Sequence, residues 1–198
     1  MDPFADNPPS PVSVTNPPTN PVITLDPRPD VMPANVRAGQ VIGLVEVVGG
    51  LGTAVDVAKL ADEFGSDLVT LLPVLDTGEM LGLVKLSKGD VSLTEFGLKF
   101  QKTSKNKVKL LREQLSKIEP FKTAIELAAR EGSVSAAEVS ESLWERDVRW
   151  HHTPEINETL VQTLLIHWAI YAGLLSYNGK TGKFQETLDE RKQRANQK

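Results

Sequence analysis

Two stretches of this sequence carry residue types that could bind a nucleotide or a metal ion. The first runs from Gly173 to Thr181, GLLSYNGKT, and ends in the Gly-Lys-Thr of a phosphate-binding loop. Such a loop has four residues between its glycines and leads from a strand into a helix, whose N-terminus meets the phosphate. Here five residues separate Gly173 from Gly179, a helical pattern precedes the stretch and a strand pattern follows it. We therefore interpret it as a hairpin turn without a nucleotide.

The second stretch contains His151, His152 and Glu155, and His167 follows further along the chain. Adjacent histidines tend to point apart, Pro154 starts a helix between these residues, and no cysteine completes a closed ligand set for zinc. We interpret the histidine pair as polar loop residues and His167 as a hydrogen-bonded residue of a long helix. Because no triad spacing or carboxylate pair stands out either, we predict no enzyme activity, no cofactor and no metal.

A third candidate binding site is a positively charged segment. Residues 99–122 contain seven lysines and Arg112 against Glu113 and Glu119, a net charge of +6 in a chain whose net charge is −4. This segment forms either a solvated helix face or a docking face for an acidic partner or a nucleic acid. The predicted basic face consists of Lys102, Lys105, Lys107, Lys109 and Arg112.

Apolar residues at helical spacing, together with capping residues and glycines, place these candidates in two similar units. The pattern predicts helices over 36–48, 54–64 and 67–81 in the first unit, and over 121–130, 135–146 and 154–175 in the second. Gly49-Gly50 is expected to end the first helix, and Thr53 to cap the second. A connecting helix over 105–118 buries a stripe that includes Val108.

A short hairpin is predicted after the third helix of each unit, in MLGLVKLSKGDVSL at 80–93 and in YAGLLSYNGKTGKF at 171–184. Aligning Gly82 with Gly173, with a gap of one residue in the second hairpin, places Gly89 on Gly179. This order of elements is that of a winged helix, so the predicted fold class is mainly α with small β-hairpins, arranged as tandem winged-helix (α+β) repeats joined by a connector helix.

Proline content and charge define the bounds of the predicted parts. Residues 1–35 hold ten of the thirteen prolines and are expected to be a disordered tail. The other parts are a first winged-helix unit at 36–104, a connector helix at 105–119, a second winged-helix unit at 120–185 and a charged C-terminal tail at 186–198.

Winged helices often bind DNA through the third helix, which offers Arg, Lys, Asn or Gln to the major groove. The corresponding segments here, 66–79 and 155–173, contain no Lys or Arg and carry acidic residues that phosphates would repel. Packing against protein is favoured. The alternative is a DNA-binding transcriptional regulator that uses the basic face and the lysines of the two wings, which are Lys85, Lys88, Lys180 and Lys183.

The region from 35 to 185 resembles the AAA-associated C-terminal domain that follows the ATPase domain in nitrate/sulfonate/bicarbonate-type ABC transporters. The resemblance rests on the stretch from VIGLVEVVGG to LTEFGLKF, on KLLREQL and on HWAIYAGLLSYNGKTGKF. It implies a regulatory or protein-interaction appendage with no catalytic residues to carry over. Because Walker A and ABC signature motifs are absent from this sequence, it also implies an ATPase supplied in trans. Homo-oligomerisation is a further mode of assembly.

Compartment is predicted from what the sequence lacks. There is no cysteine, no signal-peptide pattern at the N-terminus and no apolar run of the ~18–20 residues that a membrane span needs. We therefore expect a cytoplasmic protein that does not insert into a membrane.

Overall fold

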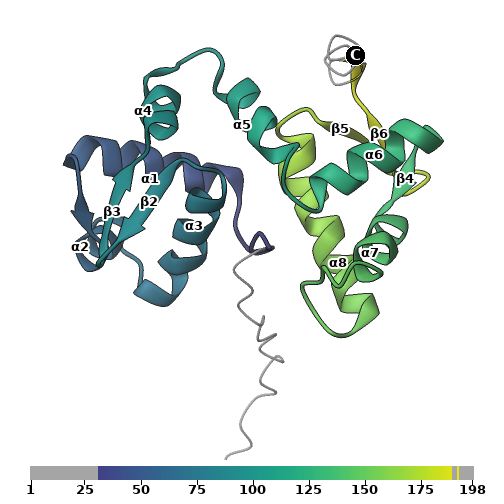
Figure 1. Ribbon diagram of the computed structural model, residues 1–198, viewed down its shortest axis with the longest axis horizontal. Coiled ribbons are helices and arrows are strands. Elements are labelled where there is room, and N and C mark those ends of the chain that lie inside the picture. Colours follow the sequence, from purple (N-terminus) through teal and green to yellow (C-terminus); the bar gives the residue numbers. More distant parts are fainter. Residues whose placement is uncertain (1–30, 189–190, 192–198) are drawn as a thin grey trace, which may run out of the picture.

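The computed structural model describes residues 31–188 and 191, and helices dominate it. The first half contains α1 (Ala38–Leu51), β1 (Val55–Asp56), α2 (Val57–Phe64), α3 (Leu68–Met80), β2 (Val84–Ser87), β3 (Asp90–Leu93) and α4 (Glu95–Lys102). After α5 (Lys107–Leu115), the second half contains α6 (Phe121–Glu131), β4 (Val134–Ser135), α7 (Ala136–Trp144), α8 (Pro154–Leu164), the π-helix η1 (Leu165–Ile170), β5 (Leu175–Asn178) and β6 (Lys183–Glu186). The halves lie side by side, with α5 running between them (Figure 1). A mainly helical chain with small β-hairpins is confirmed.

Both halves repeat the same sheet topology. Each has three antiparallel strands, in the orders β1-β3-β2 and β4-β6-β5, so that a two-residue strand before the second helix pairs with the last strand of the half. Val55 lies opposite Val91 in the first sheet, and Val134 lies opposite Phe184 in the second. Two residues are too few to show a period-two pattern, and the sequence therefore does not predict β1 or β4.

The hairpins agree with the sequence except at the second turn. Val84 and Leu86 lie opposite Leu93 and Val91, as predicted. Lys88 and Gly89 form a two-residue turn, both at positive φ. The second turn spans residues 179–182, and its left-handed glycine, directly before β6, is Gly182. The alignment of Gly89 with Gly179 is therefore wrong, because the second turn is two residues longer.

A glycine and a threonine close the base of each hairpin in the same way. Gly82 and Gly173 follow the preceding helix with φ of 67° and 69°. The hydroxyl of Thr94 donates to the carbonyl of Gly82, and the hydroxyl of Thr187 donates to the carbonyl of Gly173. The alignment of Gly82 with Gly173 is therefore confirmed by a repeated hydrogen bond.

The first helix is longer than predicted. Gly49 and Gly50 lie inside α1 and do not end it. A Cβ built on Gly49 would lie 2.0 Å from Nε2 of Gln101, just beyond which α4 ends. The end of the Gln101 side chain thus occupies the space that a side chain at Gly49 would fill, a tertiary contact that a local pattern does not reveal.

The second helix is capped by a residue other than the predicted Thr53. α2 begins after Asp56, whose carboxylate accepts hydrogen bonds from the backbone N–H groups of Ala58 and Lys59 at 2.9 and 3.0 Å. Thr53 and Ala54 precede β1 and are exposed. The missed strand thus also explains the misplaced cap.

The connector and the long helix differ from their predicted forms. α5 is shorter than 105–118 and buries Leu110, Leu111 and Leu115, whereas Val108, predicted to be buried, is 39% exposed. The long helix ends as η1, so that Tyr171 is 46% exposed and Leu175 begins β5. Because a π-turn is wider than an α-turn, it shifts which side chains face the core.

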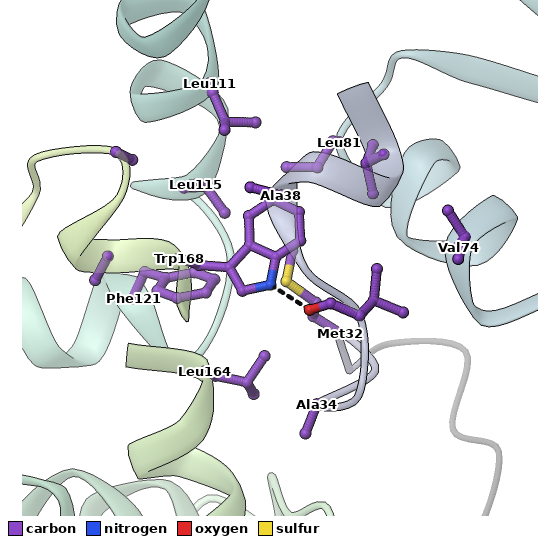
Figure 2. Packing of buried hydrophobic residues seen from close by; sticks show 14 of the residues in the cluster. Met32, Ala34, Ala38, Val74, Leu81, Leu111, Leu115, Phe121, Leu164 and Trp168 are labelled. Carbon is purple, nitrogen blue, oxygen red and sulfur yellow. Dashed lines mark hydrogen bonds between the residues drawn. The ribbon is translucent and has the colours of Figure 1, made fainter. Parts of the chain in front are cut away.

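Residues 31–37, which we call the strap, join the two halves. The predicted disordered tail reaches residue 35, but Val31, Met32 and Ala34 are buried, and this part of the prediction is wrong. Figure 2 shows Met32 and Ala34 beside Trp168 and Leu164 of the second half. The apolar residues of the strap are buried in the core, although the sequence around them is rich in proline. Residues 1–30 lie outside the described chain.

Two tryptophan indole groups donate hydrogen bonds to the strap. Nε1 of Trp150 donates to the carbonyl of Met32 at 2.7 Å, and Nε1 of Trp168 donates to the carbonyl of Val36 at 2.8 Å. At the other end of the chain, the predicted charged tail begins with Glu186, which is a buried residue of β6. Residues 189–190 and 192–198 of that tail lie outside the described residues.

Candidate protein interface

The structure divides the predicted basic face between different partners. Lys107 forms an ion pair with Glu46 of α1 at 2.7 Å, and its ammonium lies 5.7 Å from the centroid of the Phe100 ring. Nε of Arg112 donates to the carbonyl of Ala172 at 2.7 Å, at the end of the long helix. These two cations therefore connect α5 to both halves of the molecule.

The other three residues of the predicted basic face are exposed. Lys102 ends α4, Lys105 lies in the loop before α5, and Lys109 lies in the first turn of α5. Lys105 is outside the helix, so the predicted helical spacing of Lys105, Lys109 and Arg112 does not extend to it. Their role in binding a partner stays a prediction.

The wing lysines lie on two separate hairpins. Lys85 and Lys88 are exposed on the β2–β3 hairpin, and Lys180 is exposed at the β5–β6 turn. Lys183 lies at the start of β6, with its ammonium 3.6 Å from the Glu138 carboxylate of α7. The structure thus places these residues in different halves, and their predicted contact role stays untested.

The sequence of α3 determines how this helix begins and continues. Asp67 caps it: its carboxylate accepts from the N–H of Thr70 at 2.7 Å, and hydrogen bonding with Thr70 holds the pKa of Asp67 below its usual range. Pro73 lies inside the helix, and its carbonyl accepts a 2.7 Å hydrogen bond from the hydroxyl of Thr77. The helix start that the sequence predicts at residue 67 therefore agrees with the cap at Asp67.

One side of α3 is buried and the other is exposed. Leu71, Val74 and Leu75 are in the core. The exposed side, which we call the α3 face, begins with three apolar residues, Leu68, Val69 and Leu72, which are 45%, 79% and 45% exposed, and continues with two carboxylates, Asp76 and Glu79. The apolar end is a feature that helical spacing alone does not reveal, because Leu68 and Leu72 also fit the predicted core stripe.

The carboxylate end of the α3 face is electrostatically strained. Partial burial, with the charge of Glu79 one turn away, raises the pKa of Asp76. Glu79 is held in place by the backbone N–H of Leu86, which donates to its Oε1 at 3.1 Å. Among the ion pairs of the described residues, none involves Asp76 or Glu79. The face therefore offers negative charge beside an apolar patch.

The corresponding helix of the second half exposes a different surface. Ile166, Ile170 and Tyr171 are partly exposed at its C-terminal end, while the exposed acids Glu155 and Glu158 lie at its N-terminal end. Apolar and acidic residues are thus in the opposite order from α3. The two halves share a fold but present different surfaces to a partner.

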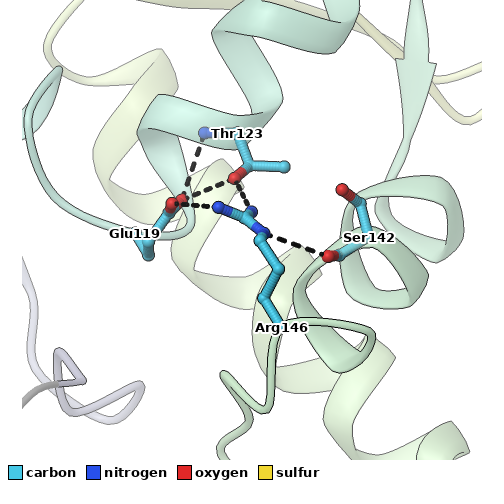
Figure 3. A network of polar contacts seen from close by, with 4 residues as sticks. All are labelled: Glu119, Thr123, Ser142 and Arg146. Carbon is cyan, nitrogen blue, oxygen red and sulfur yellow. Dashed lines mark hydrogen bonds and ion pairs between the residues drawn. The ribbon is translucent and has the colours of Figure 1, made fainter.

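A polar network joins α6 to α7 (Figure 3). The carboxylate of Glu119 accepts from the backbone N–H and the hydroxyl of Thr123 at 3.1 and 2.7 Å, and it pairs with Arg146 at 3.1 Å. Arg146 also donates to the hydroxyl of Thr123 and, through Nε, to the carbonyl of Ser142. These contacts connect the start of α6 to the residues that follow α7.

A second polar cluster is buried beneath the histidine pair. Oδ1 of Asn157 accepts from the N–H of Trp150 at 2.7 Å and from the N–H of His151 at 3.2 Å, and its Nδ2 donates to Ser140 at 2.8 Å. The sequence does not single out Asn157, because an asparagine on a helix shows no sign of burial. Its hydrogen bonds position the loop before α8.

The histidines differ from their expected arrangement. His151 and His152 do not point apart: their rings stack at 4.3 Å, and Nδ1 of His151 accepts from the N–H of Thr153. The prediction that His167 is hydrogen-bonded fails at Nδ1, which is buried without a hydrogen-bond partner in the π-helix. Within the described chain, no group of three His, Cys, Asp or Glu residues could hold a metal ion.

The near phosphate loop is a hairpin, as predicted. Gly173 ends the helix, Leu175 to Asn178 form β5, and Lys180 and Thr181 lie in the turn before β6. The element that directly follows the Gly-Lys-Thr residues is the strand β6, not a helix. This geometry lacks the helix N-terminus that cradles a phosphate in such a loop.

Comparison with known proteins identifies one family. The model of the C-terminal AAA-associated domain matches residues 58–178, which is more than half of the chain. No curated protein and no solved structure shows a match. Across the part of the chain that the structure describes, none of the helices has both the length and the apolar character that crossing a membrane requires.

Proposed function

The chain belongs to the C-terminal AAA-associated domain family, and from this membership we propose that it is a non-enzymatic protein-interaction module that binds and regulates the ATPase of an ABC transporter. In this proposal the ATPase is a separate chain, and the two proteins meet in the cytoplasm. The partner is expected from the nitrate/sulfonate/bicarbonate-type transporters, whose ATPases resemble this chain in their C-terminal appendage.

We further propose that each half is a winged helix. The support is the order of elements: a helix, a short strand, two helices and a hairpin occur in each half, and the short strand pairs with the last strand of the hairpin. In such a fold the third helix and the wing form the usual contact surface. In the first half these elements are α3 and the β2–β3 hairpin.

The observation that carries the proposal is the chemistry of the α3 face. Val69 is 79% exposed and lies between two exposed leucines, Leu68 and Leu72. The helix then continues with Asp76 and Glu79, where a DNA-binding helix would carry a cation that contacts bases. A DNA backbone would repel those carboxylates and would leave the apolar side chains in water. A protein surface can bury the apolar side chains and pair with the carboxylates.

The competing function is DNA binding through exposed lysines. Lys102, Lys105 and Lys109 lie close together in sequence on and near α4 and α5, and all three are exposed. Phosphate contacts through such residues would give an affinity that falls steeply with salt.

The test uses the purified full chain and two probes. One probe is the purified ATPase subunit of a nitrate/sulfonate/bicarbonate-type transporter from the same organism, and the other is a duplex DNA of mixed sequence. Calorimetric titration near 0.15 M salt is expected to show saturable binding to the ATPase and none to the duplex. Saturable duplex binding that is lost in the double variant Lys105→Glu/Lys109→Glu would instead support the regulator.

A further inference from the structure

We propose that the α3 face is the docking site for an amphipathic segment of the partner ATPase, one that presents apolar side chains beside lysine or arginine. This inference rests on the proposed function, and it names the surface and the chemistry of the partner. Three features of α3 and its surroundings lead to it.

The first feature is the arrangement of the exposed apolar residues. Leu68, Val69 and Leu72 lie on successive turns of the same side of α3. Single exposed apolar residues are ordinary on protein surfaces, but a contiguous group on one helix face is characteristic of an interaction site. The buried side of the helix is already in contact with the core through Leu71, Val74 and Leu75, so the exposed side is available to another molecule.

The second feature is the sign of the charge around this patch. Between Lys59 and Lys85, which are the nearest cations in sequence on either side, the chain contains five acidic residues and no Lys or Arg. The acidic residues are Asp62, Glu63, Asp67, Asp76 and Glu79. A partner must therefore bring its own cations, and a segment without them would place uncompensated carboxylates at the rim of the contact.

The third feature is that one of these carboxylates, that of Glu79, is oriented before binding, with a second carboxylate beside it. Glu79 is oriented by the N–H of Leu86 from the adjacent strand, and Asp76 lies one turn before it on the same side of the helix. Partial burial and the neighbouring charge raise the pKa of Asp76, so an arriving cation relieves a repulsion that already exists in the free protein. This favours Lys or Arg at that end of the partner segment, and apolar side chains at the end near Val69.

The alternative occupants fit less well. Nucleic acid carries the same sign of charge as the face. A second copy of this chain could offer the exposed Val108 of α5 with Lys105 and Lys109 beside it. That arrangement would be a head-to-tail contact, which does not close on itself unless the rotation forms a ring. Light scattering of the chain without the ATPase distinguishes a second copy from the ATPase.

The experiment measures binding of the purified ATPase subunit to the full chain and to three single variants. Val69→Asp introduces a charge at a position that is 79% exposed, so folding is expected to be unaffected. Asp76→Lys reverses a charge on the same face. Val108→Asp is the matched control, because it makes the same substitution at an exposed valine on α5.

Val69→Asp is expected to weaken binding by about tenfold or more, and Val108→Asp to leave it within about twofold. Binding of the wild-type chain should weaken as salt rises, and Asp76→Lys should weaken binding and flatten this salt dependence. Equal ATPase binding by wild type and Val69→Asp would overturn the docking site but leave the proposed function intact. The absence of any ATPase binding by the wild-type chain would overturn both.

Two further outcomes identify the other occupants. If Val108→Asp weakens ATPase binding and Val69→Asp does not, the interface lies on α5 and the inference is wrong. If Val69→Asp instead abolishes a concentration-dependent dimer, seen by light scattering without the ATPase, and leaves ATPase binding unchanged, the face binds a second copy. Either result contradicts docking of the ATPase on the α3 face.

Discussion

The indole N–H of Trp168 donates a 2.8 Å hydrogen bond to the carbonyl of Val36, a residue 132 positions earlier in the chain. Trp168 is completely buried, and Figure 2 shows its ring packed beside Phe121, Leu115 and Ala38. A residue of the second half thus fixes the segment that leads into the first helix. The strap is therefore part of the core that holds the two halves together.

Replacement of Trp168 by Phe should destabilise the chain. The substitution leaves the buried carbonyl of Val36 without its donor and opens a small cavity beside Phe121, and we expect a loss of about 2–4 kcal/mol in the free energy of unfolding. Urea denaturation followed by circular dichroism measures this loss. Trp144→Phe is the control, because Trp144 is only partly buried and its indole is not bonded to the strap. An equal loss in both variants would show that the hydrogen bond to the strap does not contribute to the free energy of unfolding.

Truncation should show that the strap stabilises the chain and that the residues before it do not. A chain that begins at Val31 keeps all the strap contacts, whereas one that begins at Ala38 lacks the carbonyls that accept from Trp150 and Trp168. We expect only the shorter chain to melt at a markedly lower temperature and to show red-shifted tryptophan emission, because water then reaches both indoles. Red-shifted emission from the chain that begins at Val31 would contradict the role of the strap.

A single methyl group should disrupt the contact between α4 and the first hairpin. A Cβ on Gly97 would lie 1.9 Å from the backbone oxygen of Leu83, which cannot move aside as a flexible side chain could. Gly97→Ala is expected to cost about 3 kcal/mol or more of stability. Gly39→Ala in α1 meets no atom within 4 Å and should stabilise the chain by about 0.5 kcal/mol. Thermal melts of the two variants that shift in the same direction would contradict this contact.

The start of α7 should make stability depend on pH. The backbone N–H and the hydroxyl of Ser135 donate to the Glu138 carboxylate, and these bonds hold the pKa of Glu138 below its ordinary value of 4.5. Because the folded pKa is lowered, the contribution to stability is complete above pH 4.5 and is lost as the pH falls through the folded pKa. Glu138→Gln should therefore lower the melting temperature at pH 7 and have a smaller effect at pH 3.

Glu141→Gln, at an exposed position of the same helix, is the control for the cap. It should change the melting temperature little at either pH, because Glu141 lies outside the hydrogen bonds between Ser135 and Glu138. A constant difference between wild type and Glu138→Gln from pH 7 to pH 3 would show that the charge of Glu138 does not contribute.

Local patterns predict much of this fold. The hairpin pairing of Val84 with Leu93, the cap at Thr94 and the helix start at Pro154 all follow from residues within a few positions of one another. The same holds for the equivalence of Gly82 and Gly173, because a left-handed residue after a helix favours glycine. The predictions that fail concern contacts between residues that are far apart in the sequence. The carbonyl of the buried Met32 accepts a hydrogen bond from Trp150, 118 positions away, and Gly49 within α1 lies against the side chain of Gln101 from α4.

The sequence predicts the chemistry of the candidate interface, but it does not predict which residues form it. The absence of Lys and Arg from the third helices is visible in the sequence and favours a protein partner. Which leucines of α3 face solvent is not, because Leu68 and Leu75 both fit an apolar stripe and only packing decides that Leu75 is buried and Leu68 is 45% exposed. Similarly, sequence groups Lys107 and Arg112 with the exposed lysines, although in the structure they bond to Glu46 and Ala172.

The most direct test of the central claim is calorimetric titration of the full chain with the purified ATPase subunit of a nitrate/sulfonate/bicarbonate-type transporter from the same organism, alongside a titration with duplex DNA at about 0.15 M salt. The account predicts saturable binding to the ATPase that Val69→Asp weakens, and no binding to the duplex. Saturable binding to the duplex that is lost in Lys105→Glu/Lys109→Glu, together with no heat from the ATPase, would contradict it.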